Sequence, residues 1–213
     1  LKQMMVKNDL EKITCHLNNL SIEHVVLKGL ALNFDGIYQS GIRFSRDIDL
    51  LVRTDEINET YEVLKSLGFH YFDKRTQDTI KYRYGYHFPA MINENNTKLE
   101  LHWRLTSPSY FKNCPLKDRM LEERRVSNTN TQVFCPSIET NLAHLIYHGL
   151  IHHRMNLGPV FLFDLAAMYR FYENKLPADI DLLKSLGLEK EYAVSVDLIK
   201  RANHEDYFSE DSM

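Results

Sequence analysis

The sequence predicts an α/β (α+β) fold, with an α/β domain over residues 1–135 and a helical part over residues 136–213. Three observations lead to this prediction. Short β-branched runs alternate with helical patterns in the first third of the chain, and extended, aromatic-rich runs follow over residues 69–103. From Ser137 to about residue 203 the apolar periodicity is helical, apart from a few interruptions.

The first expected element is an amphipathic N-terminal helix. Its apolar residues recur at steps of three and four positions, which places them on one helix face: Val6, Leu10, Ile13, Leu17 and Leu20. A helix with a single apolar stripe buries that stripe against a core. We therefore expect this helix to pack on the rest of the α/β domain.

Strands and helices are expected to alternate in the segment that follows. The β-branched run 24–28 predicts a strand, and residues 30–38 have a helical pattern. The stretch 47–52 predicts the next strand. A helix is expected over about 55–67, with Gly68 as its natural C-terminal stop.

The next stretch, residues 69–103, is rich in aromatic side chains. A turn-prone cluster at 93–96 separates two extended runs within it. In the second run, 98–104, alternation places Glu100 and His102 on one face and apolar side chains on the other: Leu99, Leu101 and Trp103. The sequence thus predicts a strand with an acid on one face and a hydrophobic wall on its reverse.

The remainder of the chain is mostly helical in pattern. A charged helix is expected at about 116–125 and a short strand near 131–135. The helical pattern that begins at Ser137 is interrupted in three places: 156–159, 176–177 and around Gly187.

The composition is that of an ordinary globular protein. The chain has 213 residues, of which 44% are hydrophobic and 26% charged. A net charge of −3 provides no global field that would attract nucleic acid or an anionic membrane, so nucleic acid is an unlikely partner. Any polyanionic ligand is therefore expected to be held by a local cluster of residues. The sequence indicates no oligomeric state.

The sequence also favours a cytoplasmic protein. No run approaches the roughly 18 consecutive apolar residues of a membrane span, and the N-terminus has no signal-peptide pattern. The cysteines are odd in number and widely spaced, which fits neither a disulfide framework nor a metal knuckle: Cys15, Cys114 and Cys135. A reducing cytoplasm is therefore expected.

Two acids in the strand 47–52 provide the first candidate site. Alternation places Asp47 and Asp49 on one face, together with Leu51. Cβ atoms two residues apart on a strand face are roughly 6–7 Å apart, so both carboxylates can reach one divalent cation. Without a cation, two neighbouring buried anions would repel each other. The pattern predicts a metal site, and the alternative is a solvated strand face.

Basic residues flank these acids. Lys28 and Gly29 lie at a strand-to-helix turn, where a glycine lets the backbone approach a phosphate and free N–H groups favour an anion. Alternatively, Lys28 is a strand-end lysine that extends to water. Arg43 and Arg46 could clamp phosphate bidentately or form ion pairs with the two acids.

Three stretches together resemble the uncharacterised nucleotidyltransferase family of the DNA polymerase β-type nucleotidyltransferase superfamily. They are Leu27-Lys28-Gly29, Arg43-x-x-Arg46-Asp47-x-Asp49-Leu50-Leu51-Val52 and Leu99-Glu100-Leu101-His102-Trp103. The resemblance covers about residues 24–103 and continues weakly through the histidine-rich helix and the Asp164 segment.

The resemblance implies a mixed β-sheet, nucleotidyltransferase-like core with an acidic triad as its catalytic and metal-binding group. Asp47 and Asp49 would bind Mg²⁺ (with Mn²⁺ possible), and Glu100 would be the third carboxylate. The phosphate-binding residues it implies are Lys28, Gly29, Arg46 and Arg43. The implied reaction moves a nucleoside monophosphate from an NTP, ATP by superfamily habit, to an unidentified small-molecule or protein acceptor, and releases pyrophosphate.

Histidines are further candidates for the cleft of such a site. His102 shares a strand face with Glu100, and His87 lies in the preceding aromatic run. His148 belongs to a helix face on which histidines recur at four-residue intervals, from His144 to His152. A polar patch at the nucleotide cleft, plain packing and a zinc site are all compatible with that spacing.

One departure from the superfamily pattern leaves alternatives open. The superfamily's glycine is usually followed by Ser or another Gly, whereas this chain has Leu30 and so lacks a hydroxyl contact to the terminal phosphates. This departure favours a non-catalytic nucleotide- or protein-binding module on the same fold. A third hypothesis is a metal-dependent phosphohydrolase built on the histidine helix.

Overall fold

The computed structural model describes residues 2–38, 43, 45, 47–72, 85–106, 115–130, 132–156 and 160–204. Its core is a mixed sheet with the strand order β1-β2-β5-β4-β3, which confirms the predicted fold class. β2 runs parallel to β5, and the other pairings are antiparallel. The strands are β1 His24–Val26, β2 Asp47–Val52, β3 His70–Tyr71, β4 Met91–Ile92 and β5 Lys98–His102.

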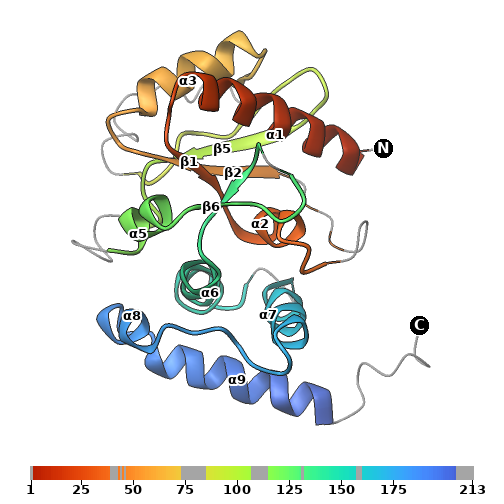
Figure 1. The fold of residues 1–213 in the computed structure, drawn as a ribbon, viewed down its shortest axis with the longest axis vertical. Coiled ribbons are helices and arrows are strands. Elements are labelled where there is room, and N and C mark those ends of the chain that lie inside the picture. The colour runs from red at the N-terminus through yellow and green to blue at the C-terminus, as the bar shows by residue number, and fades with distance from the viewer. Residues whose placement is uncertain are drawn as a thin grey trace. The chain divides into compact units, whose positions relative to one another are not determined.

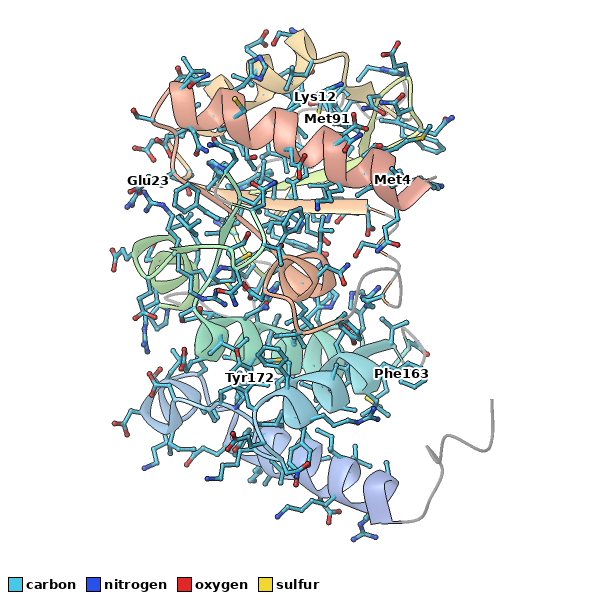
Figure 2. All side chains as sticks on the ribbon, turned by 45° about the vertical axis from the view of Figure 1, so that its right-hand side comes forward. Met4, Lys12, Glu23, Met91, Phe163 and Tyr172 are labelled. Carbon is cyan, nitrogen blue, oxygen red and sulfur yellow. The ribbon has the colours of Figure 1, made fainter. Side chains whose placement is uncertain are left out.

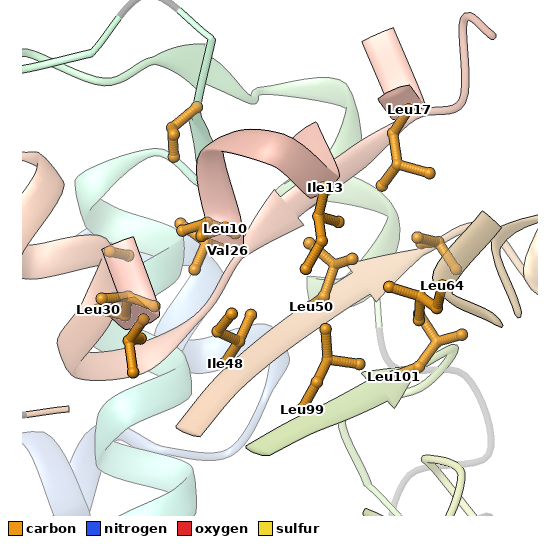
Figure 3. Packing of buried hydrophobic residues seen from close by; sticks show 14 of the residues in the cluster. Leu10, Ile13, Leu17, Val26, Leu30, Ile48, Leu50, Leu64, Leu99 and Leu101 are labelled. Carbon is orange, nitrogen blue, oxygen red and sulfur yellow. The ribbon is translucent and has the colours of Figure 1, made fainter. Parts of the chain in front are cut away.

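Helices lie on both sides of this sheet (Figure 1). α1 Lys2–Asn19 and α3 Ile57–Ser66 lie over one face, and α2 Lys28–Phe34 and α5 Leu116–Glu122 lie on the other side. The main core forms between the sheet and α1 and α3 (Figure 3). Its members include Leu10 and Ile13 of α1, Leu64 of α3, and alternate residues of the two central strands: Ile48, Leu50, Leu99 and Leu101. The intervening residues of β2 and β5 therefore face the opposite side of the sheet.

The apolar stripe of α1 packs as its spacing predicted, except at its end. Val6, Leu10, Ile13 and Leu17 are fully buried, and burying one such side chain contributes about 1.5–3 kcal/mol. Leu20 is 51% exposed, so its assignment to the stripe was wrong, because it lies beyond the last residue of the helix. Lys12 lies on the exposed side of α1, and Met91 of β4 belongs to the core; both side chains are labelled in Figure 2.

The predicted boundaries need correction around α2. The strand expected over 24–28 ends at Val26, and α2 begins at Lys28 and ends at Phe34 instead of spanning 30–38. Gly36 ends the helix early, because it adopts φ +74° and its N–H donates to Asn33. Gly68 ends α3 in the same way, with φ +86°, as the sequence predicted.

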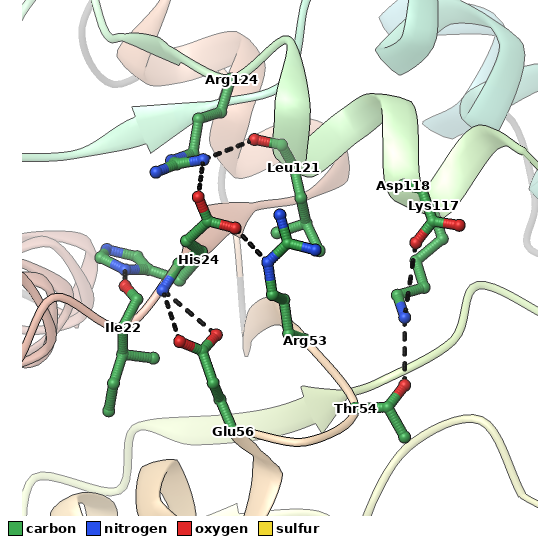
Figure 4. Close-up of polar contacts among 10 residues, drawn as sticks. Ile22, His24, Arg53, Thr54, Glu56, Lys117, Asp118, Leu121 and Arg124 are labelled. Atoms are coloured by element: carbon green, nitrogen blue, oxygen red, sulfur yellow. Dashed lines mark hydrogen bonds and ion pairs between the residues drawn. The ribbon is translucent and has the colours of Figure 1, made fainter.

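A second, two-stranded sheet follows α5. β6 Arg125–Val126 pairs antiparallel with β7 Phe134–Cys135, whereas the sequence predicted only a strand near 131–135 and extended the helix to 125. A polar network ties this region to the main sheet (Figure 4). Glu23, just before β1, forms ion pairs with Arg53, just after β2, and with Arg124, just before β6.

The chain divides into two compact units, Leu1–Ser137 and Ile138–Met213. In the second unit, α7 packs against α6 and α9. Its helices confirm the helical pattern from Ser137 onward: α6 Ile138–Ile146, the π-helix η2 Tyr147–His152, α7 Val160–Phe171, α8 Ile180–Ser185 and α9 Glu189–His204. The functional division into domains 1–135 and 136–213 stays a prediction.

Two further expectations concern cysteines and membrane spans. Cys15 and Cys135 are free thiols, and Cys114 lies outside the described residues. Across the described ranges, no helix is both long enough and apolar enough to cross a membrane.

Candidate active site

The two central strands place two acids side by side. The neighbouring strands β2 and β5 (Figure 1) form a parallel ladder in which Asp49 is the partner of Glu100. Both side chains lie on the face opposite Ile48 and Leu50, because side chains alternate along each strand. Asp49 is buried and Glu100 is half-buried. Two carboxylates from sequence-distant strands therefore meet at one point of the sheet.

Lys28 reaches this point from the turn between β1 and α2. Its Nζ donates a hydrogen bond to Oδ1 of Asp49 at 2.7 Å, and its side chain is only 20% exposed. The structure therefore does not show the alternative role, in which Lys28 extends to water. Lys28 has a left-handed backbone, with φ 59°, which costs a residue with a side chain about 1–2 kcal/mol. Strained backbone of this kind clusters at functional sites.

His102 and His87, both predicted as cleft residues, lie beside the acids. Nε2 of His102 is 3.0 Å from Oδ1 of Asp49 and 3.6 Å from Oε2 of Glu100. His87 forms an antiparallel bridge with His102, and its Nε2 is 4.0 Å from Oε2 of Glu100. His102 is fully buried, and its Nδ1 has no hydrogen-bond partner among the described residues. The imidazole rings of His87 and His102 thus lie next to the two carboxylates.

The donor set fits a divalent cation. Asp49, Glu100 and His102 each offer one ligand atom, and these three atoms lie within 4.8 Å of one another. Carboxylate oxygens suit Mg²⁺ and Mn²⁺, and an imidazole nitrogen suits Mn²⁺ and later first-row metals. Among the described residues, this is the group of three donor side chains whose ligand atoms lie close enough together to hold one metal ion. It shares Asp49 and Glu100 with the predicted triad and has His102 in place of Asp47.

The ionisable groups of this cluster shift one another's pKa values. Burial alone would raise the pKa of Asp49, but the Lys28 ammonium and the His102 ring lower it well below its usual range. The nearby His102 ring lowers the pKa of Glu100. Burial opposes the charged forms of His102 and Lys28, yet the neighbouring carboxylates raise the pKa of both groups. The carboxylates of Asp49 and Glu100 and the basic groups of Lys28 and His102 therefore favour one another's charged forms.

Asp47 lies at the first position of β2, where its side chain is exposed. Its pKa is nonetheless raised, first because nearby protein atoms remove part of its hydration and then because Asp49 is close. An additional cation near Asp47 would lower this pKa again, since opposite charge favours the ionised form. The metal-binding role of Asp47 stays a prediction.

Gly29 and Arg43 form a close contact. A Cβ on Gly29 would lie 2.4 Å from Nη2 of Arg43, so the guanidinium rests against the glycine backbone. The side-chain amides of Gln3 and Asn33 each donate to the Arg43 carbonyl oxygen at 3.0 Å. The space beside Gly29 thus holds an arginine, which would be the first group to meet a phosphate there. Arg46 lies outside the described residues.

Tyr86 is a neighbour of the site that sequence reasoning missed. Its ring centroid is 4.4 Å from that of His87 and 6.0 Å from that of His102. Tyr86 is half-buried. Burial and the nearby Glu100 raise its pKa. The bridge between His87 and His102 brings Tyr86 here, and that long-range pairing has no signature in local spacing.

The histidine face of the second unit follows a change in helix type. α6 continues into the π-helix η2, and the ring centroids of successive histidines are 5.8 Å (His144 to His148) and 5.6 Å (His148 to His152) apart. His148 also lies 3.1 Å from His153, measured between their Nε2 atoms. The predicted cleft role of His148 stays a prediction.

A mixed sheet with helices on both sides, and with carboxylates paired across its central parallel strands, has the architecture of a nucleotidyltransferase-like fold. The chain belongs to the family described as uncharacterised nucleotidyltransferase, whose sequence model matches residues 1–202. This membership confirms the family that the sequence motifs indicated. No curated protein matches the chain significantly in sequence.

Solved structures with TM-scores above 0.5 show the same fold. The crystal structure of JHP933 from Helicobacter pylori has 19% identity and a TM-score of 0.51, with coverage of 99% of this chain and 84% of that one. An antigenic nucleotidyltransferase-like protein from Paracoccidioides brasiliensis has 17% identity, a TM-score of 0.52, and coverage of 90% and 92%. ANT(2'')-Ia in complex with adenylyl-2''-tobramycin has 16% identity, a TM-score of 0.48, and coverage of 94% and 99%.

Proposed function

We propose that the chain is a divalent-metal-dependent nucleotidyltransferase that moves a nucleoside monophosphate from an NTP, in the first place ATP, to an acceptor. The observation that carries this proposal is the pairing of Asp49 with Glu100 on parallel strands, with His102 and Lys28 directly beside them. Membership of a nucleotidyltransferase family supports the reaction class. The acceptor is a small molecule or a protein side chain, since a net charge of −3 disfavours nucleic acid.

Each residue has a distinct task in this reaction. Asp49 and Glu100 would hold Mg²⁺ or Mn²⁺ together with Asp47, and His102 would add a nitrogen donor once its Nε2 has lost its proton. When bound, the metal neutralises charge that develops on the phosphates and aligns the attacking oxygen. Glu100 also accepts the proton that leaves the acceptor, directly or through a water molecule.

The transfer itself forms one bond and breaks another. The acceptor oxygen forms a bond to the α-phosphorus, the bond from that phosphorus to the β-bridging oxygen breaks, and pyrophosphate leaves. Lys28 and Arg43 are placed to bind the negative charge of the phosphates, with Gly29 between them and Arg46 following in sequence. Leu30 is buried in the core and offers no hydroxyl to the terminal phosphates, so we assign their binding to these cations.

The test uses two differently labelled nucleotides. The protein is incubated with Mg²⁺ or Mn²⁺ and cell extract, with ATP labelled either at the α-phosphate or at the γ-phosphate. We expect the α-label to appear on an acceptor and the γ-label to appear in pyrophosphate. Asp49→Asn should reduce the transfer to background, whereas Asp55→Asn, an exposed acid just after the same strand, should retain it.

Other outcomes identify the alternatives. Transfer of the γ-label to an acceptor would indicate a kinase. If wild type and Asp49→Asn both fail to transfer label while the wild type binds ATP, the chain is a binding module without turnover. Neither conclusion depends on the variant Leu30→Ser, which would introduce a hydroxyl at the buried position after Gly29.

A further inference from the structure

The oxygen that a metal ion would need is already used by a lysine. Oδ1 of Asp49 accepts a hydrogen bond from Nζ of Lys28 at 2.7 Å and lies 3.0 Å from Nε2 of His102. Asp49 is also the most deeply buried acid of the donor group, with its side chain 8% exposed. A cation that binds this oxygen has to displace the ammonium group or approach it closely, and like charges repel.

The backbone shows that the lysine is held at this position. Lys28 has φ 59°, a conformation that glycine adopts readily and that residues with a Cβ rarely adopt. From this position the lysine side chain reaches β2, where its ammonium meets Asp49. The backbone conformation at this position suits glycine, so we attribute the presence of a lysine there to its ammonium group.

The charges of the cluster explain what the ammonium does. Asp47, Asp49 and Glu100 would attract a free divalent cation strongly if they stood alone. The ammonium of Lys28, 2.7 Å from Oδ1 of Asp49, cancels part of that attraction while no ligand is bound. A triphosphate offers Lys28 a better partner, since an ammonium forms strong charge-assisted hydrogen bonds with phosphate and its flexible stem allows it to move.

We propose that Lys28 is a resident counter-ion of Asp49, which a divalent cation displaces and which then binds the phosphates of the incoming nucleotide. This inference rests on the proposed function for the identity of the nucleotide, but its metal-binding part stands on the geometry alone. Metal and nucleotide then bind cooperatively, because the nucleotide draws away the group that opposes the metal. The protein avoids binding a lone cation and takes up the metal together with the triphosphate.

Two simpler roles for Lys28 predict a different change in metal affinity when the lysine is removed. If Lys28 only stabilised the fold, its removal would lower stability and leave metal affinity unchanged or reduced. If it only bound phosphate, its removal would weaken the nucleotide and leave metal affinity in the absence of nucleotide unchanged. A resident counter-ion alone predicts tighter metal binding after its removal.

The experiment measures Mn²⁺ binding to the nucleotide-free protein, from the electron paramagnetic resonance signal of free Mn²⁺. The variants are Lys28→Met and Lys28→Gly, of which the second also relieves the left-handed backbone. Lys98→Met is the matched control: Lys98 is paired with Asp47 in the same ladder, but its ammonium lies over the Phe72 ring, 5.1 Å from the centroid. Thermal unfolding checks that each variant is folded.

We expect both Lys28 variants to bind Mn²⁺ at least about tenfold more tightly than wild type, and Lys98→Met to stay within about twofold of it. A non-hydrolysable ATP analogue should raise the Mn²⁺ affinity of wild type by about tenfold or more, and this coupling should shrink in both Lys28 variants. The affinity of the Lys28 variants for the analogue should fall.

Mn²⁺ binding to the Lys28 variants that is no tighter than to wild type would overturn the proposal, and so would the absence of Mn²⁺ binding in every variant. These outcomes are separate from those of the label-transfer test. If label is transferred but the Mn²⁺ affinity of the Lys28 variants does not rise, only the counter-ion proposal fails. If Mn²⁺ affinity rises but no nucleotide label is transferred, only the proposed function fails.

Discussion

His24 and His102 lie two strands apart in the same sheet, and their surroundings shift their pKa values in opposite directions. His102 faces two carboxylates, which raise its pKa despite burial. His24, in β1, is buried against the edge of the Phe134 ring, and burial lowers its pKa. Its Nδ1 lies 2.9 Å from the carbonyl oxygen of Ile22, so the neutral ring can donate there. Burial makes the neutral form the stable one at this position.

The pKa of His24 predicts a loss of stability in mild acid. A lowered folded pKa stabilises the fold fully above the unfolded value of about 6.5, and this contribution is lost as pH falls through the folded value. We expect the urea midpoint of wild type to fall more steeply between about pH 7.5 and about pH 5 than that of His24→Leu.

A matched variant separates titration from packing. Phe134→Leu removes the ring against which His24 packs but leaves the histidine in place. It should lower the free energy of unfolding at every pH and keep the steep acid dependence. Equal slopes for wild type and His24→Leu would show that His24 does not contribute to acid sensitivity.

At the scale of elements, α1 is joined to the hairpin of β4 and β5 by one buried carboxylate. Asp9 is 5% exposed and accepts hydrogen bonds from the side-chain amides of Asn93 at 2.9 Å and Asn95 at 3.1 Å. It also accepts a short hydrogen bond from the hydroxyl of Thr97. This turn leads directly into β5, which carries Glu100 and His102. A polar contact far from the site thus positions one of its two strands.

Removal of this carboxylate should be costly. Asp9→Ala leaves the buried amide of Asn93 and hydroxyl of Thr97 without their acceptor, which lowers the free energy of unfolding by about 2–4 kcal/mol. Urea unfolding measures the loss. Lys12→Ala, on the exposed side of the same helix, should change it by less than about 0.5 kcal/mol. A loss from Asp9→Ala as small as that of the control would show that the turn holds its conformation without α1.

The same helix shows which features the sequence could predict. The stripe of Val6, Leu10, Ile13 and Leu17 is local, so its spacing alone identified the buried face. Asp9 interrupts that pattern as an ordinary surface acid would, because its partners are 84 to 88 residues further along the chain. The two-residue strands β3, β4 and β6 are likewise too short to show alternation.

The candidate site divides in the same way. Alternation placed Glu100 and His102 on one face, and the resemblance to a known family brought Glu100 to the aspartate pair. The contact of Lys28 with Asp49 was not predictable, because it depends on the left-handed backbone of Lys28, whereas the sequence indicated only a strand-to-helix turn there. Long-range pairing and unusual backbone conformation account for most of what sequence reasoning missed.

At the scale of the whole molecule, the two compact units allow ligand binding to be located by unfolding. The acidic cluster lies entirely in the unit Leu1–Ser137, so a ligand bound there stabilises that unit directly. Separate units can unfold in separate transitions, whereas a cooperative chain unfolds in one. In either case, only binding to the folded cluster raises the transition in which this unit melts.

We expect Mn²⁺ with a non-hydrolysable ATP analogue, at about 100 times the Kd, to raise the melting temperature of that transition by roughly 5–10 °C. This estimate follows from a stabilisation of about 2.7 kcal/mol and a shift of about 2–4 °C per kcal/mol in a chain of this size. Scanning calorimetry measures the shift. A chelator should abolish the metal-dependent part, and Asp49→Asn should abolish nearly all of it, because that carboxylate is shared by the metal donors and Lys28. A shift of full size in Asp49→Asn would place the nucleotide away from the paired strands, and the sheet would then be a scaffold for a site elsewhere.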